Sequence, residues 1–205
     1  LLPGMTWLAI FFAIPFVTLF MTSLQAPVPG KSGQYTPAFQ LSNYPDAIIE
    51  YFPQFLRSFI YAGIATALAL LIAYPLAYFI AFKAGRWRAL MLVLVIAPSF
   101  ASFLLRTYAW KTILADEGFI TTFFNYLHLL PDDRILNTGI AVVAGLTYNF
   151  LPFMILPLYA ALEKIDPRLL EASNDLYASA FATFRKVTWP LSLPGVVAGT
   201  LLTFI

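Results

Sequence analysis

Cysteine is missing from the 205 residues, and histidine occurs only once. The first absence excludes a disulfide framework, thiolate metal sites and a cysteine nucleophile. The second excludes paired-histidine metal motifs, and we expect His128 to be a solvated loop residue. Charged residues are also scarce, at 11% against roughly 25% in an average soluble domain. The formal net charge of +2 is too small to indicate a nucleic-acid partner. Because cysteine is absent and histidine occurs once, we expect neither a metal site nor catalytic residues.

Apolar residues take the place of the missing charge. They make up 60% of the chain, whose mean hydropathy is +0.80. Apolar runs of about 18 or more residues are long enough to cross the hydrocarbon core as helices. We therefore predict an all-α, polytopic transmembrane bundle in a lipid bilayer, as a single domain over residues 1–205. The predicted spans are residues 1–23, 55–82, 89–114, 139–162 and 196–205. The last run has about half the length of a span, so we expect the chain to be incomplete at its C-terminus.

The basic residues predict how the spans are oriented. Lys and Arg are concentrated in short cytoplasmic loops. They gather here after the second span and in the segment 163–195, at Lys83, Arg86, Arg88, Lys164, Arg168, Arg185 and Lys186. Both segments are therefore predicted to be cytoplasmic. In the first outward connection, Ser42 or Asn43 is placed to cap a short interfacial helix.

Few ionisable residues fall within the predicted spans. Arg106 and Lys111 lie in the outer half of the third span, where they can snorkel toward headgroups or form a pair such as Lys111 with Asp116. Candidates for lining a translocation path are Arg106, Tyr108, Trp110 and Asn149. The four complete spans contain no carboxylate, which counts against an ion-coupled secondary transporter without removing it as an alternative.

The segment 163–195 is polar, unlike the apolar runs that precede and follow it. Asp166 and Pro167 are typical of a helix start, with aspartate as the N-cap and proline at the first helical position. Apolar residues then recur on one side at helical spacing, at Leu169, Leu170, Ser173, Tyr177, Ala180, Phe181 and Phe184. This pattern predicts an amphipathic helix, interrupted near 177–179, that lies against the membrane face of the protein. Pro190 and Pro194 are expected to end it and to lead into the last span.

This segment resembles the signature of ABC-importer permeases, which is E-A-A, three residues, G, nine residues, I, one residue and L-P. Glu171-Ala172-Ser173 matches the first triplet, Tyr177 stands at the glycine, Val187 at the isoleucine, and Trp189-Pro190 at the final pair. A tyrosine at the glycine position is the main departure. Either the turn is built differently here, or the helix runs on through Tyr177.

A second stretch narrows the resemblance. Residues 97–114, "APSFASFLLRTYAWKTIL", are similar to the third-span region of spermidine/putrescine permeases. The resemblance implies a non-catalytic subunit with six spans in the bacterial cytoplasmic (inner) membrane. It also implies two ATPase subunits that bind ATP and Mg, a second permease subunit and an external, periplasmic substrate-binding protein. No cofactor is expected on this chain.

The resemblance assigns the contact with the ATPases to the segment 163–195. The residues expected to take part are Glu171, Ala172, Ser173, Asp175, Leu176, Tyr177, Ala178 and Pro190. Small alanines permit close approach, and the carboxylates can meet basic residues of the partner. A polyamine is the expected substrate, and the alternatives are another small solute carried by an ABC permease or an ion-coupled carrier.

Overall fold

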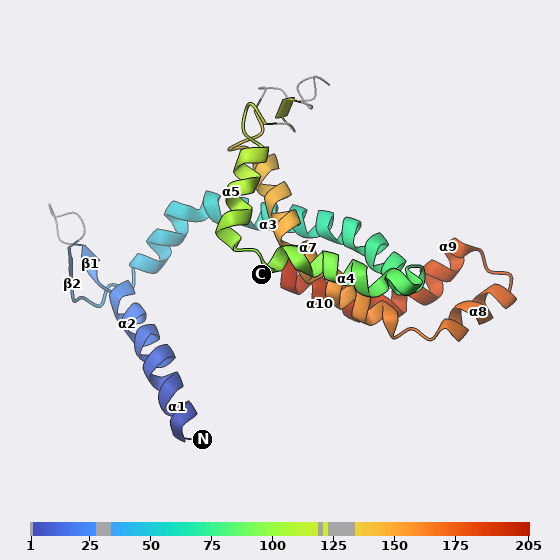
Figure 1. The fold of residues 1–205 in the computed structure, drawn as a ribbon. Helices are drawn as coiled ribbons and strands as arrows, with labels where there is room; N and C mark the ends of the chain where they lie inside the picture. The colour runs from blue at the N-terminus through green and yellow to red at the C-terminus, as the bar shows by residue number, and fades with distance from the viewer. Residues whose placement is uncertain (1, 28–33, 119–120, 123–133) are drawn as a thin grey trace. The chain divides into compact units, whose positions relative to one another are not determined.

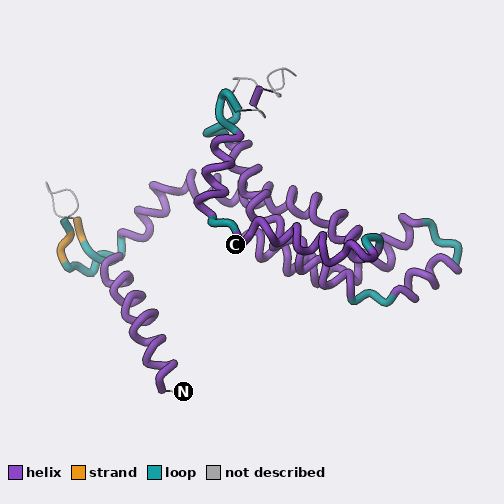
Figure 2. Tube along the Cα trace, viewed as in Figure 1, coloured by secondary structure: helices purple, strands orange, loops and turns teal. Residues whose placement is uncertain are grey.

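A computed structural model describes residues 2–27, 34–118, 121–122 and 134–205 (Figure 1). These residues are almost entirely helical (Figure 2), which confirms the predicted all-α class. Among them, the strands β1 (Ala26–Pro27) and β2 (Tyr35–Thr36) form a short antiparallel pair. The chain divides into two compact units, Leu1–Arg57 and Ser58–Ile205. The predicted loop residue His128 lies outside the described residues.

The first unit begins with an apolar helical run, Pro3–Ser23, that is long enough to cross a membrane. It consists of α1 (Leu2–Leu8), a π-helical turn η1 (Ala9–Ala13) and α2 (Ile14–Ser23). Pro15 is the second residue after the π-helical turn. Proline has no N–H and its ring crowds the preceding turn, so the wider π turn lets the helix continue instead of breaking.

Helix α3 (Asn43–Phe82) starts at one of the two predicted cap positions but does not stop where we expected. It runs for 40 residues, so the separate short interfacial helix predicted before residue 55 is wrong. No glycine occurs between Asn43 and Gly63, and the helix therefore has no flexible residue at which to end before the span. At its far end Gly85, with φ of 49°, makes the turn that leads into the next helix.

The predicted third span is a broken helix. After the 3-10 turn η2 (Gly85–Trp87), α4 (Arg88–Ile96) and the turn η3 (Ala97–Phe100) form one arm, and α5 (Phe103–Ile113) forms the other. The two arms meet at an angle of 94°. The chain becomes extended at Ala101, where ψ is 144°, three residues after Pro98. The first arm rises about 20 Å, which is less than the hydrocarbon thickness of about 30 Å.

The second unit is built around α7 (Gly139–Glu163) and α10 (Trp189–Phe204). The main apolar core joins α3, α7 and α10 and contains Ala69, Ala73, Tyr74, Ala77, Ile80, Met154, Ile155, Leu158, Tyr159, Leu162, Ile165 and Val196. At its centre, the hydroxyls of Tyr74 and Ser192 are 2.8 Å apart and hydrogen-bonded. Gly195 allows α10 to approach α7 closely, because a Cβ there would lie 2.6 Å from the Cβ of Ala161.

The predicted spans have counterparts in the structure, with different bounds. Pro3–Ser23, Asn43–Phe82, Gly139–Glu163 and Ala180–Phe204 are long and apolar enough to cross a membrane, and the bent pair α4–η3 with α5 is a candidate broken span. The last of these starts well before residue 196. Residues 180–195, which were predicted to lie before the last span, therefore belong to a helix that is continuous with that span.

Candidate functional site

The polar segment between α7 and α10 forms two short helices at one end of the second unit (Figure 1). The first, α8 (Pro167–Asp175), starts as predicted, because the Asp166 carboxylate accepts a hydrogen bond of 2.9 Å from the backbone N–H of Arg168. The second, α9 (Ala180–Thr183), is capped by Ser179, whose hydroxyl accepts a bond of 3.3 Å from the N–H of Ala182. Both helix starts are fixed locally by side chains adjacent to them.

The turn between these helices has the left-handed backbone conformation that is usual for glycine, although the residue there is a tyrosine. Tyr177 has a φ of 55°, in the left-handed region. The N–H of Ala178 donates to the carbonyl of Ser173 at 3.1 Å, which is the long hydrogen bond of a Schellman helix end. The predicted interruption near 177–179 is therefore confirmed. Of the two alternatives for Tyr177, the helix does not run on, and the turn accepts a left-handed tyrosine at a cost on the order of 1 kcal/mol.

This turn places apolar side chains in full exposure. Tyr177 is 99% exposed, Leu176 82% and Phe181 70%. We name these three residues the apolar tip. The prediction that Tyr177 and Phe181 lie against the membrane face of the protein is wrong, since both side chains are exposed and do not pack on the rest of the unit. Exposed large apolar groups that cluster on a polar helix are typical of a contact surface.

The remaining residues predicted to contact an ATPase are divided by the structure. Glu171, Ala172 and Asp175 are exposed beside the apolar tip, while Ala178 is half-buried. Ser173 is occupied within the chain, because its hydroxyl bonds that of Thr183 on α9 at 2.8 Å. The exposed residues remain candidates for partner contact, whereas Ser173 ties the two helices of the segment together.

Pro190 does not end the segment as expected. The π-helical turn η4 (Phe184–Thr188) connects α9 to α10, and Pro190 lies in the first turn of α10. Pro194 lies inside α10. As at Pro15, a π turn ends two residues before the proline, and this wider turn lets the helix continue without the hydrogen bond that proline cannot donate. Residues 180–204 consequently form one continuous helical run, and α9 is a direct extension of the span.

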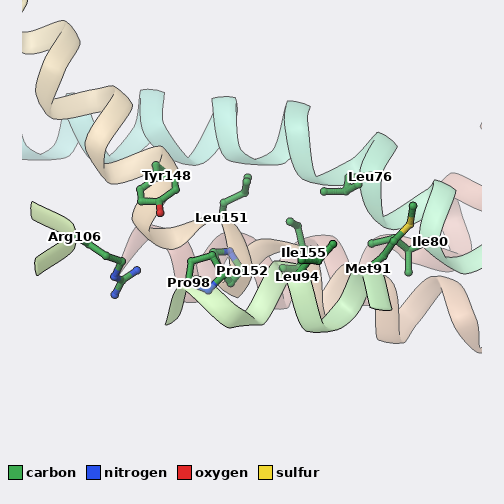
Figure 3. A pocket seen from close by; sticks show the side chains of 11 residues that line it. Leu76, Ile80, Met91, Leu94, Pro98, Arg106, Tyr148, Leu151, Pro152 and Ile155 are labelled. Carbon is green, nitrogen blue, oxygen red and sulfur yellow. The ribbon is translucent and has the colours of Figure 1, made fainter. Parts of the chain in front are cut away.

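A cavity of about 320 Å³ lies among α3, α4, α5 and α7 (Figure 3). Its walls are apolar and are formed by Leu76, Ile80, Met91, Leu94, Val95, Pro98, Leu151, Pro152 and Ile155, with Tyr148 and Arg106 at one end. Arg106 carries the only formal charge among the lining residues. Its Nε is buried without a hydrogen-bond partner in the described part of the chain, and its guanidinium lies 6.0 Å from the Phe103 ring centre.

The other proposed path residues are not all brought to this cavity. Trp110 stacks on Tyr148, with ring centres 5.6 Å apart and planes 1° from parallel, and donates to the carbonyl of Ala141 at 3.4 Å. Tyr108 is exposed on α5. The amide nitrogen of Asn149 donates to the carbonyl of Gly145 at 2.9 Å within α7. Trp110 therefore supports the cavity wall through Tyr148, while Tyr108 and Asn149 do not line it.

Asp116 has a partner other than the expected one. Its carboxylate lies 3.8 Å from the Nε of Arg134, so the predicted example pairing with Lys111 is wrong. Both side chains of the observed pair are well exposed. Such a surface pair contributes about 0–1 kcal/mol and does not by itself indicate a binding site.

One cluster was not singled out from the sequence. Arg88, the first residue of α4, donates from Nε to the hydroxyl of Tyr159 and forms a salt bridge with Glu163, the last residue of α7. Its guanidinium also lies 4.9 Å from the centre of the Tyr159 ring. The available sequence signal was a basic residue at a helix start and an acidic residue at a helix end, each opposite to the usual preference. Within the described residues, no group of three or more metal-ligating side chains was found.

Comparison with known proteins finds relatives along almost the whole chain. The spermidine/putrescine transport system permease protein PotB of Haemophilus influenzae is 39% identical over 202 residues, covering 98% of this chain and 70% of that protein. Its counterpart in Escherichia coli is 37% identical over 201 residues, covering 97% of this chain and 72% of that protein. The inner membrane ABC transporter permease protein YdcU of Escherichia coli is 35% identical over 162 residues, covering 73% and 52% of the two chains.

Solved structures agree on the fold. One chain in the crystal structure of a bacterial ABC transporter involved in the import of the acidic polysaccharide alginate aligns with a TM-score of 0.63. The two are 19% identical, and the alignment covers 98% of this chain and 69% of that one. No protein-family model matches the chain. The helices around α7 and α10 thus have the ABC-importer permease fold, and the identities along nearly the full chain show that it belongs to the family of spermidine/putrescine transport system permeases, multi-pass proteins of the bacterial inner membrane.

Proposed function

We propose that this chain is the non-catalytic permease subunit of an ATP-driven polyamine importer and that α8, the apolar tip and α9 form its contact with an ATPase subunit. The observation that carries the proposal is the exposure of Leu176, Tyr177 and Phe181 on an otherwise polar segment. Burial of an exposed Leu side chain yields about 1.5–3 kcal/mol, so these residues offer apolar area that a partner can bury. Glu171 and Asp175 beside them suit basic residues on the partner.

The proposed assembly contains two ATPase subunits, which bind ATP and Mg, a second permease subunit and an external binding protein. The present chain needs no cofactor in this scheme. ATP-driven closure of the ATPases would displace α8 and α9. Because α9 is continuous with α10 and α10 packs closely on α7, the displacement would reach both helices and change the side to which the path is open.

Polyamines such as spermidine and putrescine are the proposed substrates because the named relatives are spermidine/putrescine transport system permeases. Arg106 favours a second candidate, a solute with an anionic group, since it is the only charged residue that lines the cavity. A polyamine path would need its carboxylates from other parts of the complex. The ion-coupled carrier is disfavoured by membership in an ABC permease family.

The test is site-specific crosslinking in membranes that contain the full-length protein and its partners, with any other cysteine replaced by serine. A cysteine replaces Ala172 on α8, and Tyr35→Cys on the predicted outward side is the matched control. We expect a nucleotide-sensitive crosslink to an ATPase from position 172 alone. Labelling of position 172 only from outside, with no ATPase crosslink, would refute the proposed contact. Uptake of radiolabelled putrescine by the same membranes tests the substrate separately.

A further inference from the structure

The cluster of Arg88, Tyr159 and Glu163 connects two helices that are distant in sequence. Arg88 opens α4, and both of its partners lie on the last turn of α7. Tyr159 is buried in the main core, whereas Arg88 and Glu163 are partly exposed. The guanidinium therefore binds one fixed partner, the tyrosine, and one partner at the surface, the carboxylate. Its planar fork suits this double contact in a way that a lysine would not.

Both charges oppose the field of their own helices. A helix N-terminus carries partial positive charge and disfavours a base, and a C-terminus carries partial negative charge and disfavours an acid. Arg88 stands at an N-terminus and Glu163 at a C-terminus, while Lys164, the next residue, has the sign that this end prefers. Local preferences that conflict in this way are found mainly at functional positions. Separating the pair would leave each charge in an unfavourable field, so the pair holds the two helix ends together.

The cluster is close to both the proposed ATPase contact and the wall of the cavity. Only Lys164 and Ile165 separate Glu163 from Asp166, the cap of α8. Ile165 is buried in the main core, so this connection is short and anchored. On the other side, α4 supplies Met91, Leu94 and Val95 to the cavity wall, and η3, which follows α4 directly, supplies Pro98. Arg88 thus connects the start of α8, which belongs to the proposed ATPase contact, to α4, which lines the cavity.

We propose that Arg88 is a positioning residue of the transport cycle: through Glu163 and Tyr159 it makes α4 follow the displacement of α8, so that the cavity wall moves when the ATPases close. This rests on the proposed function, since it requires that a partner displace α8. It adds a second route of transmission, because α9 reaches α10 directly through the continuous helix whereas α4 is reached through this side-chain cluster.

The experiment compares two reporter cysteines in the full-length protein, reconstituted with its partner subunits and free of other cysteines. Leu94→Cys reports on α4 in the cavity, and Val197→Cys reports on an exposed position of α10. The rate of maleimide labelling is measured with and without Mg, ATP and vanadate, which requires no substrate. With Arg88→Met, we expect the nucleotide-dependent change at position 94 to fall about five-fold or more and the change at position 197 to remain within about two-fold.

Two further variants separate transmission from mere stability. The exchange of Arg88→Glu with Glu163→Arg restores the pair and places each charge at the helix end that favours it, so it should restore the response at position 94. Arg86→Met removes a neighbouring arginine with no carboxylate partner among the described residues and should leave both responses intact.

Each result has a definite meaning. An unchanged response at position 94 in Arg88→Met, or its loss at both positions with no recovery in the exchange, would overturn the role of Arg88. If the protein with Arg88 intact shows no nucleotide response at either position while the ATPases are bound, the proposed coupling itself fails, and this inference fails with it.

Discussion

Close packing between α7 and α10 predicts that Gly195→Ala destabilises the protein. The added Cβ would lie 2.6 Å from the Cβ of Ala161, 2.7 Å from the carbonyl oxygen of Pro157 and 3.1 Å from the Cα of Leu158. None of these atoms belongs to a flexible side chain that could rotate away, so the two helices would have to separate. Overpacking of this kind costs about 1–3 kcal/mol.

Gly63→Ala on α3 is the matched control. A Cβ at this position meets nothing within 4 Å, so the change should stabilise the helix by about 0.5–1 kcal/mol through alanine's higher helix propensity. The two variants should therefore differ by about 1.5–4 kcal/mol in free energy of unfolding. In a protein of this size about 1 kcal/mol shifts Tm by about 2–4 °C, so thermal unfolding in detergent should separate their Tm values by at least about 3 °C. A Gly195→Ala variant as stable as Gly63→Ala would refute the close-packing argument.

The other predictions concern single hydrogen bonds and the exposed turn. Tyr74→Phe removes the buried hydrogen bond to Ser192 and should lower the free energy of unfolding, measured by thermal unfolding, by about 1 kcal/mol. The control is Tyr78→Phe, which should leave this free energy unchanged because the Tyr78 hydroxyl has no hydrogen bond among the described residues. Asp166→Ala removes the cap of α8 and should accelerate hydrogen exchange in its first turn about five-fold, with no change in α7; equal exchange would contradict the cap. Tyr177→Gly should relieve the left-handed strain and slow exchange of the Ala178 N–H severalfold, yet weaken co-purification of the ATPase, whereas a variant that binds the ATPase fully would show that the tyrosine ring is not part of the contact.

Features that depend on neighbouring residues were predictable from the sequence. The start of α8 follows from an aspartate directly before a proline, and its end near Tyr177 follows from the family spacing. Both are decided within one helical turn. The membrane class likewise follows from composition alone, because 11% charge cannot cover the surface of a soluble domain.

Two kinds of feature were not predictable from the sequence: the effect of a proline on its own helix, and contacts between distant segments. The 94° bend in the third span and the continuation of α10 through Pro190 both involve proline, which the sequence shows, but its effect depends on the turn before it. Three residues after Pro98 the chain becomes extended, whereas before Pro190 a π turn preserves the helix. Arg88 was visible only as a loop charge, since its partners follow it by some seventy positions and meet it only in the folded protein.

The π-helical turn at Phe184–Thr188 also makes the direction of α9 depend on the length of the chain at this point. A π turn amounts to one extra residue in an α-helix, and each residue turns the helix by about 100°. Deleting one residue here would restore the α-helical period and rotate α9 by that angle while the lipid-facing surface of α10 stayed in place. A change in length alone would thus re-aim the proposed ATPase contact, without altering any residue of α10.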